Sequence, residues 1–147
     1  MKTMPLRTVD VLLVEDSEAD ADLVREALAG GKLIVNLAVV QDGEAAMSYL
    51  RREGTYASAP RPDLVLLDLN LPNKSGQEVL REVKSDPDLG VIPIVVLTTS
   101  AADQDILRSY QLHANAYIAK PVEFESFIQI VNQVTEFWLS LVVLPRA

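Results

Sequence analysis

The stretch DLVLLDLNLPNKSG, residues 63–76, decides the fold and raises the main chemical question. An uninterrupted apolar run, Leu64–Leu67, ends at the ionisable residue Asp68. Such a run is typical of a strand that is covered on both faces. A carboxylate at the tip of a buried strand is costly unless it is paired or used. The stretch therefore predicts a central strand whose carboxyl end has partners elsewhere in the chain.

Short apolar runs alternate with helical patterns along the chain, which is typical of βα units around a parallel sheet. No internal repeat or second domain is visible. We therefore expect one α/β domain over residues 1–147, a doubly wound five-stranded parallel sheet with five helices and a core at about 8–135. The five strands are expected at about Val9–Val14, Leu33–Val39, Leu64–Leu67, Ile92–Leu97 and Ala116–Ile118.

The expected helices have recognisable starts. Ser17 and Asp42 precede two of them and are good N-cap residues. Ser75 and Ser100 are each followed three residues later by an acid, which matches a capping box. The last helix opens after Pro121.

Composition narrows the class of protein. The 147 residues are 23% charged and 49% hydrophobic, as in folded globular proteins. The formal net charge of −8 argues against a nucleic-acid surface. There is no cysteine, no apolar run of about 18 residues and no start that resembles a signal peptide. We therefore expect a cytoplasmic protein without a membrane span.

Polar side chains follow four of the expected strands. Since ligands of doubly wound sheets bind at the carboxyl ends of the strands, these side chains are expected to meet at one edge. They are the carboxylates of Glu15, Asp16 and Asp68, the hydroxyl of Thr98 and the ammonium of Lys120.

This set is chemically coherent. Clustered carboxylates repel one another unless a cation lies among them, and ligation by oxygen suits Mg²⁺. A carboxylate can attack phosphorus and form an aspartyl phosphate. Phosphoryl transfer then needs mainly positioning and charge neutralisation, which a metal ion and a lysine supply. A hydroxyl at Thr98 is placed to donate a hydrogen bond to a phosphoryl oxygen.

Along nearly its whole length, the chain resembles the receiver domains of two-component response regulators. The matching residues are the acidic pair Glu15-Asp16, Asp68 in LLDLNLP, Thr98 in VVLTTS and Lys120 in YIAKP. The resemblance implies the flavodoxin-like receiver fold with strand order 2-1-3-4-5. It also implies a response regulator that accepts a phosphoryl group from a sensor histidine kinase, and not an enzyme acting on other molecules.

The resemblance assigns a metal site to the acidic residues. Asp68 would be the phosphoacceptor, and Asp16, Asp68 and the backbone carbonyl of Asn70 would bind Mg²⁺ directly. Glu15 would act on the ion through water. Mn²⁺ or Ca²⁺ would be substitutes for Mg²⁺.

The resemblance also assigns the phosphoryl contacts and a switch. Thr98 and Lys120 would contact the phosphoryl group. Tyr117 matches the aromatic residue that changes rotamer on activation, so Thr98 and Tyr117 would form the switch. Two departures from the family stand close to the site: a Glu-Asp pair replaces the commoner Asp-Asp, and Thr99 stands where a smaller residue is usual. Crowding by Thr99 would slow phosphorylation.

Other functions fit less well. A dinucleotide-binding protein would need glycines after the first strand, where this chain has VEDSEAD. A phosphatase with an aspartate nucleophile usually has a second acid two residues later, where this chain has Asn70. A phosphate-independent interaction module or a phosphorelay intermediate with the same fold remains an alternative.

The C-terminal stretch NQVTEFWLSLVVLPRA, residues 132–147, is apolar beyond a receiver's usual length. A helix that is apolar most of the way round needs a second covering surface. We expect a helical extension at about 136–147 and a homodimer through the fourth helix, fifth strand and fifth helix. The alternative is that the tail folds back onto its own domain. Residues expected at the dimer interface are Phe137, Trp138, Leu141 and Val142.

A narrower resemblance concerns the partner. The ending FWLSLVVLP, with LNLPNKSGQEVL and LTTS, is similar to the small response regulators of cyanobacterial phytochromes. It implies a light-regulated histidine kinase, a phytochrome, as phosphodonor. Because the chain ends soon after its last helix, we expect the receiver itself to deliver the response by dimerisation, partner binding or phosphate relay, without nucleic acid or membrane.

Overall fold

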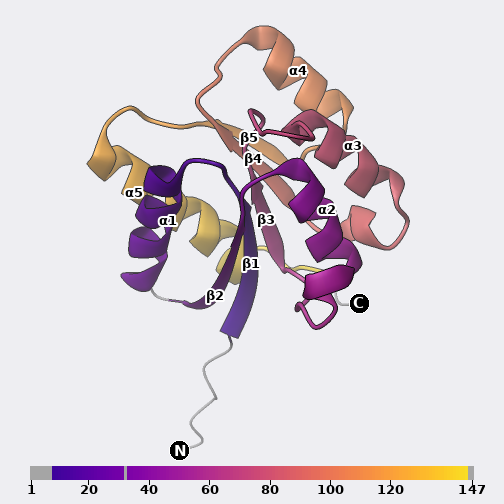
Figure 1. Cartoon of the computed structure of the whole chain (residues 1–147). Coiled ribbons are helices and arrows are strands. Elements are labelled where there is room, and N and C mark those ends of the chain that lie inside the picture. The colour runs from indigo at the N-terminus through magenta and orange to yellow at the C-terminus, as the bar shows by residue number, and fades with distance from the viewer. Residues whose placement is uncertain (1–7, 32, 146–147) are drawn as a thin grey trace, which may run out of the picture.

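The apolar run Leu64–Leu67 forms β3, the middle strand of a five-stranded parallel sheet in the computed structural model. All four of its residues are buried, as expected for a strand covered on both faces. The structure describes residues 8–31 and 33–145, and the strands follow the order β2-β1-β3-β4-β5 (Figure 1). The fold expected from the sequence is therefore confirmed. The other strands are β1 (Thr8–Val14), β2 (Ile34–Val40), β4 (Ile94–Thr98) and β5 (Ala116–Ala119).

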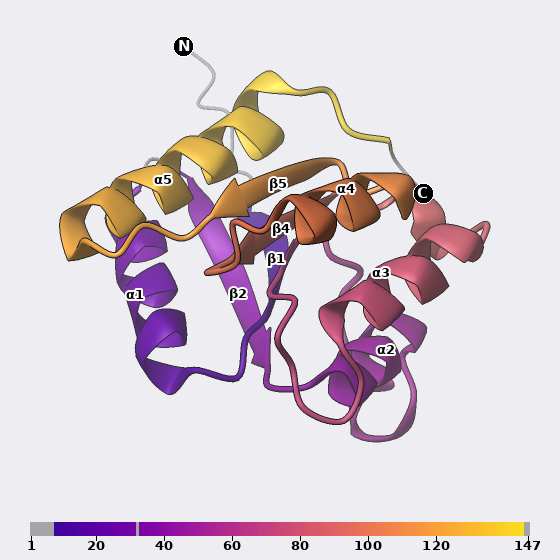
Figure 2. The ribbon, with the colours of Figure 1, turned by 90° about the horizontal axis from the view of Figure 1, so that it is seen from above.

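Helices cover both faces of the sheet (Figure 2). On one face lie α1 (Glu18–Ala29) and α5 (Phe124–Glu136); on the other lie α2 (Gly43–Arg51), α3 (Gly76–Ser85) and α4 (Asp103–Gln111). Alternate strand residues supply the two cores: Leu13 and Leu66 pack with the α1–α5 side, Leu12 and Leu67 with the α2–α3 side. Two short 3₁₀ turns, η1 (Gly54–Tyr56) and η2 (Leu89–Val91), lie at connections.

Three of the four expected N-caps are confirmed. The side chains of Ser17, Asp42 and Ser75 each accept a hydrogen bond from the backbone N–H three residues later. The expected cap at Ser100 is wrong, because α4 begins at Asp103 after Ala102, which makes no side-chain cap. The hydroxyl of Ser100 instead donates to Oδ2 of Asp105, at 2.5 Å, since a carboxylate is the stronger acceptor.

The C-terminal segment combines the two alternatives considered for it. After α5, a π-helical turn, η3 (Phe137–Leu141), ends the helix, so the expected helical extension to 147 is wrong beyond Leu141 in the described part. Val142 is extended, because β-branched residues and the following Pro145 disfavour helix.

Residues 142–145 then lie beside the amino ends of β1, β3 and β4. Together with Val9, Arg61–Asp63 and Val91–Pro93 they border a cavity of about 560 Å³. The tail thus folds back onto its own domain. The side chains of Phe137, Leu141 and Val143 nevertheless stay exposed. No helix among the described residues is long and apolar enough to cross a membrane.

Gly76, the first residue of α3, provides a test of how closely this helix approaches β3. A Cβ at this position would lie 2.2 Å from the carbonyl oxygen of Asp68. Gly76→Ala must therefore shift backbone, and we expect it to lower the free energy of unfolding by about 1–3 kcal/mol. Urea denaturation measures this.

The matched control is Gly30→Ala at the end of α1, where a Cβ would meet nothing closer than 3.9 Å. This variant should stay within about 0.5 kcal/mol of wild type. Equal stability of the two variants would contradict the close approach of α3.

Candidate functional site

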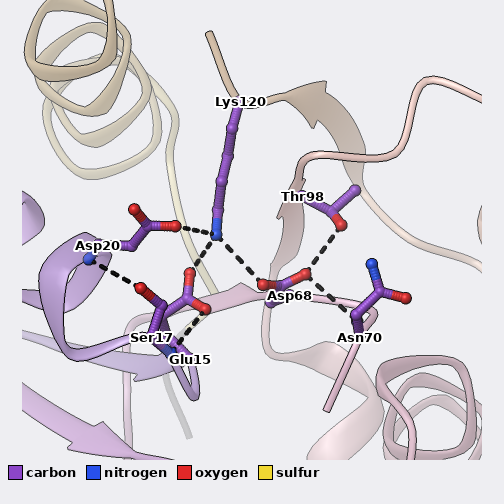
Figure 3. A network of polar contacts seen from close by, with 7 residues as sticks. All are labelled: Glu15, Ser17, Asp20, Asp68, Asn70, Thr98 and Lys120. Carbon is purple, nitrogen blue, oxygen red and sulfur yellow. Dashed lines mark hydrogen bonds and ion pairs between the residues drawn. The ribbon is translucent and has the colours of Figure 1, made fainter. Parts of the chain in front are cut away.

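The carboxyl ends of β1, β3, β4 and β5 bring the expected polar residues together (Figure 3). Val14 is paired with Leu67 across β1 and β3, so Glu15 and Asp68 leave neighbouring strands at the same level. Of the five expected residues, Glu15, Asp68, Thr98 and Lys120 are buried, and Asp16 is exposed. The sequence-based expectation that these side chains share one edge is confirmed.

Asp68 has a partner on each carboxylate oxygen. Its Oδ1 accepts a hydrogen bond from the Thr98 hydroxyl at 2.8 Å and from the Asn70 backbone N–H at 3.3 Å. Its Oδ2 accepts one from Nζ of Lys120 at 3.2 Å. The carboxylate at the tip of β3 is therefore paired by residues from the ends of two other strands (Figure 3).

Lys120 lies at the centre of this network. Its side chain is only 4% exposed, and Nζ donates to carboxylates of Glu15, Asp20 and Asp68. The distance to Asp20 Oδ2 is 2.8 Å. Three donors thus meet three acceptors, which satisfies a buried ammonium.

The contact of Asp20 with Lys120 was not expected from the sequence. Asp20 lies in the first turn of α1, where its backbone N–H donates to the Ser17 hydroxyl at 3.2 Å. Its position in the sequence could have indicated the contact, because the helix that follows β1 starts at the same edge of the sheet as the other site residues. Ser17 adds a second local contact, since its backbone N–H donates to Glu15 Oε2 at 3.3 Å.

Burial and charge set the protonation of the site. Burial raises the pKa of Glu15 to about 7, against the opposing effect of its hydrogen bond with Lys120. Burial also acts to raise the pKa of Asp68, but the neighbouring Glu15 side chain and the charge of Lys120 outweigh it, and the net pKa lies below the usual value. Asp68 is therefore held as a carboxylate, the form that acts as a nucleophile.

The pKa of Lys120 moves in the opposite direction from that expected for a buried amine. Burial lowers this pKa, but the hydrogen bonds to Asp20 and Glu15 and the charge of Asp68 raise it by more, so the net pKa lies above the usual value. The side chain is therefore a permanent positive charge next to the carboxylate of Asp68.

The acidic residues fit a divalent cation. One carboxylate oxygen each from Glu15, Asp16 and Asp68 lies within 4.8 Å of the others. Carboxylate oxygens are the donors that Mg²⁺ and Mn²⁺ prefer, and Asp16 is exposed, which gives an ion access.

Tyr117 on β5 lies beside the loop between β4 and α4. Its hydroxyl donates to the carbonyl of Ser100 at 2.9 Å, and its backbone N–H donates to the Tyr110 hydroxyl at 3.2 Å. Asp105 of α4 holds the same loop, because it accepts from the Ser100 hydroxyl and, at 3.3 Å, from Gln77 of α3. These contacts connect Tyr117 to α4 and α3. The contacts of Asp105 with Ser100 and Gln77 were not expected from the sequence.

Comparisons with known proteins agree with this arrangement. The model of the response regulator receiver domain matches residues 11–132. The response regulator Rcp1 of Synechocystis is 48% identical over 137 residues, which are 93% of this chain and 93% of Rcp1. The probable methanogenesis regulatory protein FilR2 of Methanothrix harundinacea is 44% identical over 130 residues, 88% of this chain and 83% of FilR2.

Solved structures give the same result. The phosphorylated cyanobacterial phytochrome response regulator RcpA is 52% identical, with a TM-score of 0.92 over 95% of this chain and all of that one. The Mn²⁺-bound form of Rcp1 is 47% identical, with a TM-score of 0.90 over 94% of this chain and 99% of that one.

The acidic group gives a prediction about cation binding. Asp16→Asn removes one carboxylate from it, and we expect the affinity for Mg²⁺ or Mn²⁺ to fall about tenfold or more. Isothermal titration calorimetry measures this.

The control is Asp22→Asn, which removes the same charge from the exposed face of α1, where Asp22 pairs with Arg25 at 2.8 Å. Its cation affinity should remain that of wild type. An Asp16→Asn protein that binds either ion as tightly as the control would show that the cation site lies elsewhere.

Proposed function

Since this chain belongs to the response regulator receiver family, we propose that Asp68 accepts a phosphoryl group from a sensor histidine kinase. The observation that carries the proposal is the placement of the Asp68 carboxylate between a hydroxyl donor, Thr98, and a buried ammonium, Lys120. A nucleophile, two donors for the transferred group and an acidic cation site thus lie at one edge of the sheet.

The reaction is a displacement at phosphorus. A carboxylate oxygen of Asp68 attacks the phosphorus of a phosphohistidine, and a P–O bond forms as the P–N bond breaks. The histidine nitrogen keeps the electron pair and takes up a proton. Thr98 and Lys120 then donate hydrogen bonds to oxygens of the phosphoryl group. The receiver promotes only its own phosphorylation and dephosphorylation.

We assign the cation site within this proposal to four residues. Asp16, Asp68 and the backbone carbonyl of Asn70 would hold Mg²⁺ directly, and Glu15 would hold it through water. The ion would supply positive charge for the phosphoryl oxygens. The Mn²⁺-bound structure of Rcp1 and the cluster of acids support a divalent cation here, and Mn²⁺ or Ca²⁺ would substitute.

The proposed kinase is a phytochrome. This rests on RcpA, a cyanobacterial phytochrome response regulator at 52% identity, and on a regulator in red light signalling of R. palustris at 30% identity. In the proposed switch, Thr98 turns to the phosphoryl group and Tyr117 changes rotamer beside Ser100, which alters the loop that leads to α4.

Phosphorylation tests the acceptor directly. With acetyl phosphate and Mg²⁺, the wild-type chain should gain the mass of one phosphoryl group, because the Asp68 carboxylate is ionised and the Lys120 ammonium lies beside it. Asp68→Asn lacks the nucleophile and should gain none, as measured by mass spectrometry of the intact protein. Asp22→Asn should behave as wild type. An unchanged mass of the wild type, or a full gain in Asp68→Asn, would refute the proposal.

We also propose a homodimer through α4, β5 and α5. Its support is the set of large apolar side chains that stay exposed on α4, on α5 and on the η3 turn that follows α5. They are Leu107 and Tyr110 of α4, Phe124 of α5, and Phe137 and Leu141 of η3. Leu141 is 74% exposed, whereas Trp138 and Val142 are half-buried against their own chain. Phe137 and Leu141 would therefore make the contact between the two copies, and Trp138 and Val142 would support it from beneath.

The dimer gives a prediction with a matched control. Leu141→Glu places a charge in the proposed contact and should weaken dimerisation about tenfold or more, given about 1.5–3 kcal/mol for burying a leucine side chain. Ala57→Glu introduces the same charge at an exposed residue next to η1, away from the proposed contact, and should have no effect. Light scattering after size-exclusion chromatography measures both. Equal masses for Leu141→Glu and wild type across concentrations would exclude this interface.

A further inference from the structure

Asp20 is the one carboxylate at the site that the proposed chemistry leaves without a role. Its Oδ2 lies 2.8 Å from Nζ of Lys120, and its side chain is 29% exposed. The group of acids that can share one cation consists of Glu15, Asp16 and Asp68 and does not include Asp20. Its place is nevertheless fixed, because its backbone N–H is held by the N-cap Ser17.

The three N–H groups of Lys120 are all taken. They point to Glu15, Asp20 and Asp68, as Figure 3 shows. An ammonium has three donors and no more. Lys120 can therefore bind a phosphoryl oxygen on Asp68 only if one of these carboxylates releases its hydrogen bond.

Exposure indicates which carboxylate is released. The side chain of Glu15 is 3% exposed, and loss of its partner would leave a buried acid unpaired, which is costly. Asp20 is partly exposed, so water can replace the ammonium at its carboxylate. Asp68 keeps a carbonyl oxygen after one of its oxygens has bonded to phosphorus, and this oxygen can still accept a hydrogen bond from Lys120. The hydrogen bond to Asp20 is the one that breaks at least cost.

We propose that Asp20 is a positioning residue that competes with the phosphoryl group for Lys120 and thereby sets the rate of phosphorylation. The inference rests on the proposed function, because it concerns the same acceptor and the same lysine. The hydrogen bond to Asp20 keeps the ammonium of Lys120 near α1, whereas a bond to the phosphoryl group would move it toward β3 and β4. A weaker hydrogen bond to Asp20 therefore makes Lys120 more available to the phosphoryl group.

The test replaces the carboxylate of Asp20 by a carboxamide of the same shape. Asp20→Asn keeps an oxygen acceptor but loses the charge, and charge-assisted hydrogen bonds are about twice as strong as neutral ones. We expect phosphorylation by acetyl phosphate to become about two- to fivefold faster, the range for a partly exposed ion pair. Asp20→Glu restores a carboxylate at this position and should return the rate toward wild type.

Two comparisons separate the contact from other effects. Asp22→Asn removes the same charge from the same helix without touching Lys120, and its rate should equal that of wild type. In a double-mutant cycle with Lys120→Met, the effect of Asp20→Asn should disappear, which a purely structural role of Asp20 would not produce. Urea denaturation of each variant establishes that it is folded.

The outcomes are distinct. A rate in Asp20→Asn that equals or falls below wild type, or an equal gain in Asp22→Asn, overturns the inference while the proposed function stands. An Asp20→Asn effect that persists in Lys120→Met also overturns it. A wild-type chain that gains no phosphoryl group overturns the proposed function, and this inference with it.

Discussion

The rest of the site depends on one interaction, the burial of the Lys120 ammonium among three carboxylates at the carboxyl edge of the sheet. Without this charge, Glu15 and Asp68 would be two acids side by side in a largely buried place, and at least one would be protonated. With it, Asp68 is ionised and its pKa lies below the usual value. The positive charge of Lys120 is also the charge that a transferred phosphoryl group requires beside it.

The sheet and the core of the site could be predicted because their signals are local. Runs such as Leu64–Leu67 identify strands, and the rule for parallel sheets places the residues after them at one edge. The contact of Asp20 with Lys120 joins residues 100 positions apart, and no pattern within the sequence fixes that distance. The same holds for Lys84, whose Nζ binds the carbonyls of Gly90 and Ile92 and the side chain of Asn115. The expected Ser100 cap failed because Asp105, five residues later, offers its hydroxyl a charged acceptor.

The C-terminal segment shows how an apolar pattern leaves its partner undefined. Helical periodicity indicates which side chains need cover, but not whether the same chain or a second copy provides it. In the structure, Trp138 and Leu139 pack against the core that α1 and α5 share, while Leu141 and Val143 remain exposed. Some residues of the segment thus pack on their own domain, and others stay exposed and available for a contact in the proposed dimer. The hydroxyl of Tyr117 is bonded to Ser100 in the loop between β4 and α4. This loop therefore joins the strand edge at Asp68 to α4, which belongs to the surface of the proposed dimer.

Chemical trapping identifies the residue that carries the phosphoryl group, which we propose to be Asp68. Borohydride reduces an acyl phosphate on aspartate to homoserine, which peptide sequencing by mass spectrometry locates to a single position. After treatment with acetyl phosphate and Mg²⁺, we expect homoserine at position 68 and nowhere else. Homoserine at position 16 or 20, or none in a chain that has gained a phosphoryl group, would contradict it.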